Sequence, residues 1–106
     1  MIIVRTVFQA KPGRGGELAA RMAANSPRIT EGMTEQMGVQ RRWRVLTDLS
    51  GPFDTVVFEV EFESLAESER ARAILFQLPA FQEHMGQVGD LLAGWHNELW
   101  TIEAEG

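Results

Sequence analysis

Residues 54–62 constrain the fold more than any other segment, because they alternate along the chain in the manner of a half-covered strand. The segment reads Asp-Thr-Val-Val-Phe-Glu-Val-Glu-Phe. Successive side chains of a strand point to opposite faces of its sheet. One face therefore carries Val56, Phe58, Val60 and Phe62, while the other carries Val57, Glu59 and Glu61. This pattern predicts a sheet with a core on one face and a mixed, uncovered surface on the other.

Three further segments have the composition of strands. Residues 2–10 are rich in β-forming side chains and stop at Lys11-Pro12-Gly13, which predicts a strand and a turn. Residues 39–47 precede the turn-rich stretch 48–52, so they are expected to form a hairpin with 54–62. Residues 95–103 predict the last strand.

Helical spacing appears in the segments between these strands. Residues 14–25 carry apolar side chains at helical spacing, and Ser26-Pro27 fits an N-cap followed by proline. We therefore expect a helix and then either a second helix or a kinked continuation, ending at Gly38. The capping box of residues 64–67 predicts a helix to about residue 77. A short helix is expected from Pro79 to Gly94, with an apolar side made of Phe81, Met85, Val88, Leu91 and Leu92.

The order β-α-β-β-α-β is the split βαβ pattern of the α+β, ferredoxin-like fold. Its four-stranded antiparallel sheet has the helices on one face. With 106 residues, the chain is expected to form one such domain over residues 1–106.

The face without helices can be predicted from parity. Leu99 is assigned to the core, as are Val39, Trp43 and Val45. The open face is then expected to hold Ile3, Arg5, Val7, Gln9, Gln40, Arg42, Arg44, Leu46, Val57, Glu59, Glu61, His96, Glu98, Trp100 and Ile102. This face carries more apolar side chains than a monomer usually exposes to water. It also carries too many charged side chains to be buried in a core without water. We therefore expect a homodimer through the sheet face, with a half-buried cavity and with Arg42–Glu59 and Arg5–Glu98 as ion pairs.

Composition narrows the choice of partners and location. A net charge of −5 disfavours a phosphate backbone, so no nucleic acid is expected as a partner. The chain has no cysteine, and no stretch approaches the roughly 18 apolar residues of a membrane span. We expect a cytoplasmic protein that does not bind a membrane. His84 and His96 are the only histidines and lack a third donor at metal-ligand spacing, so no metal is expected.

His96 is the candidate catalytic base, because parity places it at the expected cavity and an imidazole titrates near neutral pH. The candidate substrate-binding residues share the same face: Arg5, Arg42, Glu59, Glu98 and Trp100. Each has a plainer interpretation. His96 could simply end a strand, the two glutamates could be structural ions, and Trp100 could pack instead of stacking on Arg5. His84, within Gln82-Glu83-His84, is expected on the solvated surface, and Phe81 and Met85 in the core or at the cavity rim.

Several stretches resemble the dimeric α/β-barrel superfamily, in particular its NIPSNAP-like and antibiotic-biosynthesis-monooxygenase-like members. They are the first strand with Lys11-Pro12-Gly13, residues 58–67, and Leu78-Pro-Ala-Phe-Gln-Glu83 leading to Asn97-Glu98-Leu99-Trp100. The resemblance implies a homodimer whose sheets close a barrel around a small, often apolar molecule. Some members are cofactor-independent oxygenases. Haem-degrading members use a helix histidine with an Asn and a Trp; residues 2–10 contain no Asn, so we expect no haem and no other cofactor.

Two functions follow from these observations. The first is a dimeric protein that binds a small apolar or aromatic molecule beside the sheet and that could be a cofactor-independent monooxygenase. The alternative is a non-catalytic interaction or scaffold domain. The two differ in whether the space between the sheets is hollow or filled by side chains.

Overall fold

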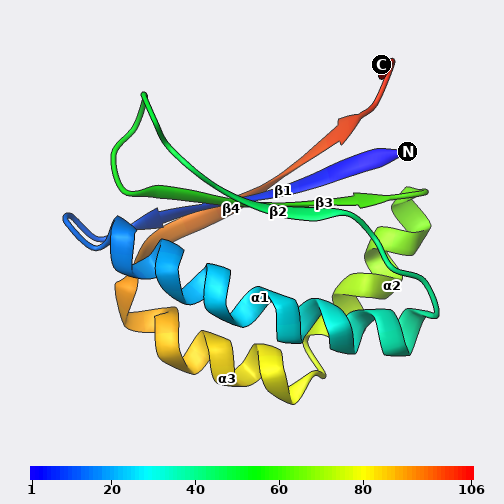
Figure 1. Cartoon of the computed structure of the whole chain (residues 1–106), viewed down its shortest axis with the longest axis horizontal. Coiled ribbons are helices and arrows are strands. Elements are labelled where there is room, and N and C mark those ends of the chain that lie inside the picture. The colour runs from blue at the N-terminus through cyan, green and yellow to red at the C-terminus, as the bar shows by residue number, and fades with distance from the viewer.

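The chain forms one sheet with its helices on one side (Figure 1). The computed structural model describes residues 1–106. The elements are β1 (Ile2–Ala10), α1 (Gly15–Met37), β2 (Trp43–Thr47), β3 (Thr55–Phe62), α2 (Leu65–Leu75), α3 (Pro79–Val88), a 3-10 turn (Gly89–Leu91) and β4 (Leu92–Thr101). The strand order is β2-β3-β1-β4, and every neighbouring pair is antiparallel. This confirms the expected ferredoxin-like α+β fold.

α1 is a single helix that continues through Pro27, which settles the choice that the sequence left open. Proline removes one backbone donor and crowds the preceding turn. Pro27 lies on the exposed side, whereas the neighbouring Ser26 is buried. The helix ends as predicted at Gly38, whose φ of 74° is left-handed and whose N–H donates to the Thr34 carbonyl.

α2 begins at the expected cap, but with a different partner for its acidic residue. The Glu67 N–H donates to Ser64 Oγ at 3.2 Å. The Glu67 carboxylate accepts from the N–H of Glu63 at 2.7 Å instead of returning to Ser64. It also accepts from Arg41 at 2.7 Å, which ties α2 to the segment before β2.

Two strands begin at residues that differ from the prediction. β2 begins at Trp43 and not at residue 39, because the chain after Gly38 first has to cross from the helix layer to the sheet edge. β4 begins at Leu92, so Gly94 lies in a strand and does not end the preceding helix. The first residues of β4 pair with the end of β1 across a register shift: Gln9 pairs with Gly94, whereas Ala10 pairs with Leu92.

The core lies between the sheet and α1 and α3. Its buried members are Ala10, Leu18, Met22, Val56, Val88 and Leu91. Trp43 stacks on Phe58 with ring centroids 5.9 Å apart, which confirms the assignment of Trp43 to the helix side. The placement of Leu99 in the core is wrong. Leu99 is on the helix side but 59% exposed, because the far half of β4 rises away from the helices (Figure 1).

None of the helices combines the length and the apolar character that crossing a bilayer requires.

Candidate functional site

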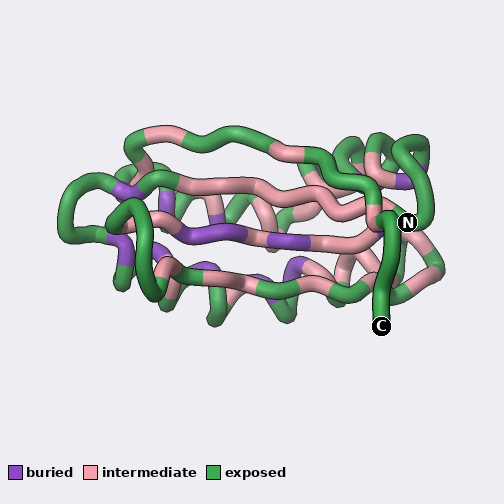
Figure 2. The backbone as a smooth tube through the Cα atoms, turned by 90° about the horizontal axis from the view of Figure 1, so that it is seen from above, coloured by how far each residue is buried: buried purple, intermediate pink, exposed green.

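One row of charged side chains crosses all four strands on the open face. The register pairs Arg44 with Glu59, Glu59 with Arg5, and Arg5 with Glu98. Directly paired residues on antiparallel strands point to the same face. The row therefore alternates in sign from one sheet edge to the other. Figure 2 looks down on this face, with the strands side by side and the helices behind them.

Glu59 sits between two arginines in this row and is 9% exposed. Its Oε2 lies 2.5 Å from an Arg44 terminal nitrogen, and its Oε1 lies 3.1 Å from Arg5 Nε. The predicted Arg42–Glu59 pair is wrong. Arg42 precedes β2, is mostly exposed, and lies 3.8 Å from Glu61 instead. In the register between β2 and β3, Arg44 is the residue directly opposite Glu59.

Arg5 occupies the middle of the face on the central strand β1. Its Nε is buried and makes no hydrogen bond, although it lies close to Glu59. Its terminal nitrogen is 3.8 Å from Glu98, which confirms the predicted Arg5–Glu98 ion pair but is too long for a hydrogen bond. A guanidinium carries five N–H donors. Arg5 therefore retains unused donors at the centre of the open face.

Glu98 joins three side chains of the predicted site. His96 Nε2 lies 3.0 Å from Glu98 Oε2, and the Trp100 indole N–H donates to Glu98 Oε1 at 3.0 Å. The hydrogen bond from His96, then that from Trp100, and the charge of Arg5 together hold the pKa of Glu98 below its usual range. Trp100 binds this carboxylate and does not stack on Arg5 as expected.

Apolar side chains border the charged row on both sides. Val7 pairs with Val57, and Val57 pairs with Leu46, in the row that also contains His96. Ile3 pairs with Trp100 on the other side of the charges. Val57 is buried, whereas Trp100 is 55% exposed. The row of Ile3 and Trp100 also contains Glu61, so the face is mixed on both sides of the charges. Gln40 and Arg42, which the sequence predicts for the same face, precede β2 and are not part of the sheet.

His84 is not on the solvated surface, which corrects the sequence-based prediction. It is 7% exposed, and its Nδ1 lies 2.8 Å from the side-chain nitrogen of Asn25 across the α1–α3 contact. Burial lowers the pKa of His84. The polar neighbours in the sequence concealed this placement. Helical spacing could have revealed it, since Phe81 and Val88 lie three and four residues away on the same side.

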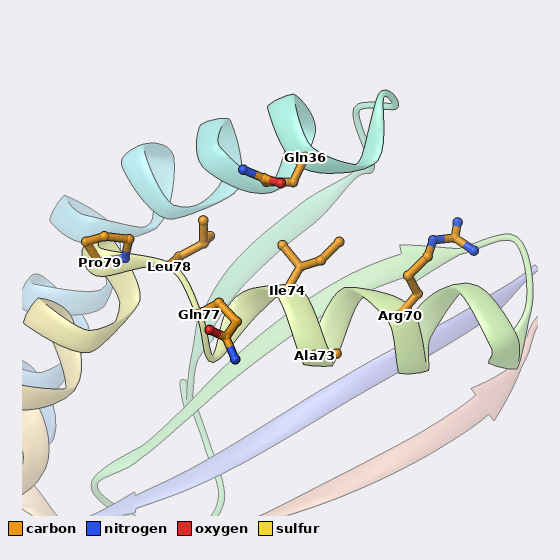
Figure 3. A pocket seen from close by; sticks show the side chains of 7 residues that line it. All are labelled: Gln36, Arg70, Ala73, Ile74, Gln77, Leu78 and Pro79. Carbon is orange, nitrogen blue, oxygen red and sulfur yellow. The ribbon is translucent and has the colours of Figure 1, made fainter.

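Two grooves on the surface of the chain lie away from the open face. The first, about 450 Å³, separates the end of α1 from α2 (Figure 3). Its lining is Gln36, Arg70, Ala73, Ile74, Gln77, Leu78 and Pro79. The second, also about 450 Å³, lies beside the start of α1 and the β2–β3 loop. Neither groove includes a predicted site residue.

No group of three or more His, Asp or Glu side chains is arranged to hold a metal ion.

This fold occurs in a class of small ferredoxin-like α+β proteins. Solved structures of this class that resemble the chain are NIPSNAP-like proteins and antibiotic-biosynthesis-monooxygenase-like proteins. An uncharacterised NIPSNAP-like domain protein from Burkholderia xenovorans superposes with a TM-score of 0.82 at 21% identity, covering 99% of this chain and 87% of that one. A candidate antibiotic biosynthesis monooxygenase from Nitrosomonas europaea superposes with a TM-score of 0.72 at 10% identity, covering 98% and 100%.

At these identities the likeness concerns the fold. No protein-family profile matches the sequence, and no curated protein sequence matches it.

Proposed function

We propose that two copies of the chain pair through their open sheet faces and bind a small, largely apolar molecule between them. The molecule forms an oxyanion when it loses one proton, as a phenol or an enolisable ring ketone does. The observation that carries this proposal is the row Arg44–Glu59–Arg5–Glu98, with His96 and Trp100 attached to its end.

The composition of the face supports pairing with a second copy. Ile3, Val7 and Leu46 surround the charges, and Trp100 is 55% exposed in the single chain. Covering such a surface removes apolar area from water, which stabilises association by about 25 cal/mol per Å². The charged row contains two arginines and two glutamates, already paired within the chain. Paired charges can be covered at a far smaller cost than isolated ones.

The unused donors of Arg5 support an acidic ligand. The terminal nitrogens of Arg5 make no hydrogen bond within the chain, and the nearer Glu98 contact is 3.8 Å long. A ligand oxygen in the space between the sheets would accept charge-assisted hydrogen bonds from these nitrogens. An oxyanion beside Arg5 would lie against the apolar walls of Val7 and Val57. Exclusion of water there strengthens the attraction between the anion and Arg5.

The Glu98–His96 contact supports a proton-transfer role. An ionised carboxylate only accepts hydrogen bonds, so neutral His96 donates through Nε2–H and keeps the lone pair of Nδ1 free. That nitrogen can take the proton of the ligand. Glu98 orients the ring and stabilises the imidazolium that forms.

A cofactor-independent monooxygenase could use this step. Oxygenation of an activated methylene group converts it to a carbonyl: one atom of O₂ becomes the carbonyl oxygen, and the other leaves as water with the two methylene hydrogens. The first hydrogen leaves as a proton to His96, and Arg5 binds the resulting enolate. The fold likeness to the candidate monooxygenase from Nitrosomonas europaea supports this proposed reaction.

The second candidate is a non-catalytic interaction or scaffold domain. It is favoured by the absence of the predicted site residues from both grooves of the single chain. In this case side chains fill the space between the two sheets.

Sedimentation equilibrium and oxygen uptake test the two functions together. A dimer should sediment with about twice the 11.9 kDa chain mass. Anthrones and phenols are then supplied while O₂ consumption is followed in the parent, in His96→Ala and in Arg72→Ala, a cation on the helix side. Uptake that His96→Ala removes and Arg72→Ala leaves intact supports the enzyme. A dimer that neither binds nor oxidises any of the compounds supports the scaffold, and a monomer contradicts both.

A further inference from the structure

The β2–β3 loop, residues 48–54, carries two apolar side chains that nothing in the chain covers. Leu49 is 103% exposed and Phe53 is 84% exposed. The loop rises from the sheet on the side opposite the helices, which is the side of the open face (Figure 1). Single exposed apolar residues are common, but two of them in one projecting loop indicate a contact with another molecule.

The base of this loop is held firmly in place. Gln9 donates from its side-chain nitrogen to the Phe53 carbonyl at 2.9 Å. The Asp54 carboxylate accepts from the N–H groups of Gly13 and Gly15 at 2.9 and 3.0 Å. Asp54 has a φ of 59°, in the left-handed region, and these bonds retain it there. The loop is thus tied to the end of β1 and to the turn between β1 and α1, and Phe53 borders the groove beside the start of α1.

A second exposed apolar surface lies on the opposite edge of the sheet. Trp95 and Leu99 occupy the helix side of the edge strand β4, and they are 55% and 59% exposed. A tryptophan so placed leaves much of a large apolar ring in water.

The loop and Trp95 lie at the same end of the sheet. Thr47, the last residue before the loop, pairs with Val56; Val56 pairs with Phe8, and Phe8 with Trp95. When two open faces meet with a twofold axis parallel to the strands, the β2 edge of one copy lies over the β4 edge of the other. Stacked sheets are about 10 Å apart. The projecting loop then reaches the edge that holds the partner's Trp95, and the same contact forms twice.

We propose that the loop of residues 48–54 is an arm that places Leu49 and Phe53 against the partner's Trp95 at the β4 edge of a second copy. The contact sets the relative orientation of the two sheets and closes one mouth of the space between them on each side. This inference rests on the proposed dimer. It adds the direction of the twofold axis and the residues whose contact defines that direction.

Cross-linking tests the arm directly, because the chain has no cysteine of its own. Phe53→Cys and Trp95→Cys proteins are unfolded, mixed, refolded together and treated with a short bismaleimide. The mixture should give a covalent dimer, whereas each protein alone should give none. Cross-linking of Phe53→Cys to itself would show that the two loops meet each other, and this would overturn the proposed axis. A dimer that gives no cross-link in the mixture would overturn the arm as well.

A second measurement compares dissociation constants. The double variant Leu49→Ser/Phe53→Ser should weaken the dimer about tenfold or more, while Leu65→Ser, an equally apolar exposed residue on α2, should leave it unchanged. A double variant that dimerises like the parent contradicts the arm and leaves the dimer itself standing. A parent protein that is monomeric at micromolar concentration removes the proposed dimer and the arm together.

Discussion

His96 Nε2 lies 3.0 Å from Glu98 Oε2, two residues along the same face of β4. Residues at this spacing point to the same side of a strand. Trp100 approaches the other oxygen of Glu98 from the opposite direction along the strand. Glu98 therefore fixes the orientation of both rings on the open face, and its own ionisation depends on them.

Removing His96 is expected to raise the pKa of Glu98. The hydrogen bond from His96 is the largest cause of the lowered pKa, followed by that from Trp100. His96→Ala removes a donor to the ionised carboxylate, so the pKa should move up toward the usual glutamate range. Trp100→Phe should raise it by less. Carboxyl ¹³C titration by NMR measures both shifts, with the remote Glu83 as an internal control. A Glu98 titration identical in parent and His96→Ala would contradict the hydrogen bond.

Two adjacent glycines at the start of α1 should respond in opposite ways to alanine. A Cβ at Gly15 would lie 2.6 Å from the Asp54 Cα, so Gly15→Ala is expected to lower the free energy of unfolding by about 2 kcal/mol. A Cβ at Gly16 meets open space, and Gly16→Ala should raise this free energy by about 0.5–1 kcal/mol through its better helix propensity. Urea denaturation measures both. Equal effects at the two positions would show that the close contact of α1 with Asp54 is absent.

Much of the open face could be predicted from the sequence because it depends on one strong pattern. The alternation of residues 54–62 indicates which side of β3 faces the helices. Parity within residues 2–10, and parity counted from Leu99 within residues 95–103, place Arg5 and Glu98 on the opposite side. The register shows that both lie in one row with Glu59. Within each strand the assignment needs only the period of two residues, once one residue has been placed relative to the helices.

Two of the failures share a different cause, since each depends on where another helix or strand begins or ends. The partner of Glu59 depends on the residue at which β2 begins, and the chain after Gly38 crosses four residues without joining the sheet, so that Arg44 replaces Arg42. Leu99 points to the helix side as predicted, but its burial needs a helix above it, and none covers that half of β4.

The Arg41–Glu67 pair is expected to stabilise the fold more than the exposed ion pairs do. The Glu67 side chain is 8% exposed, and Arg41 binds it through two nitrogens at 2.7 and 3.2 Å. Arg41→Met should lower the free energy of unfolding by about 2 kcal/mol, because a buried carboxylate loses its charged partner. Arg42→Met, at an exposed neighbouring position, should change it by less than about 0.5 kcal/mol. Thermal and urea denaturation at neutral pH would contradict this ranking if the two variants were equally stable.

The same pair predicts a loss of stability in acid. Burial alone would raise the pKa of Glu67, but the hydrogen bonds from Arg41 and from the Glu63 N–H outweigh it and lower the pKa. A carboxyl group with a lowered pKa in the folded state stabilises the fold above its unfolded pKa, and this stabilisation is lost as the pH falls through the folded value. Glu67→Gln should therefore show a smaller decrease in unfolding free energy between about pH 6 and pH 3 than the parent does. A decrease as large as that of the parent would mean that Glu67 does not contribute.

Because of His84, we expect a separate decrease in the unfolding free energy at a higher pH than the decrease caused by Glu67. Burial lowers its pKa in the folded state, whereas the unfolded chain has the ordinary value near 6.5. Above that value the ring is neutral in both states and the pH has no effect through this residue. As the pH falls below it, the unfolded state binds a proton that the folded state resists, so the unfolding free energy decreases until the folded pKa is also passed.

Unfolding free energies at about pH 7.5 and pH 5.5 isolate this effect, because glutamates and aspartates remain ionised over that interval. The parent should be less stable at the lower pH. His84→Gln keeps a hydrogen-bonding side chain beside Asn25 but cannot titrate, so its stability should change much less between the two values. His96→Ala serves as the matched control, since it removes the exposed histidine and leaves the buried one, and it should retain the full decrease. If His84→Gln lost as much stability as the parent over this interval, the burial of a neutral His84 between α1 and α3 would be wrong.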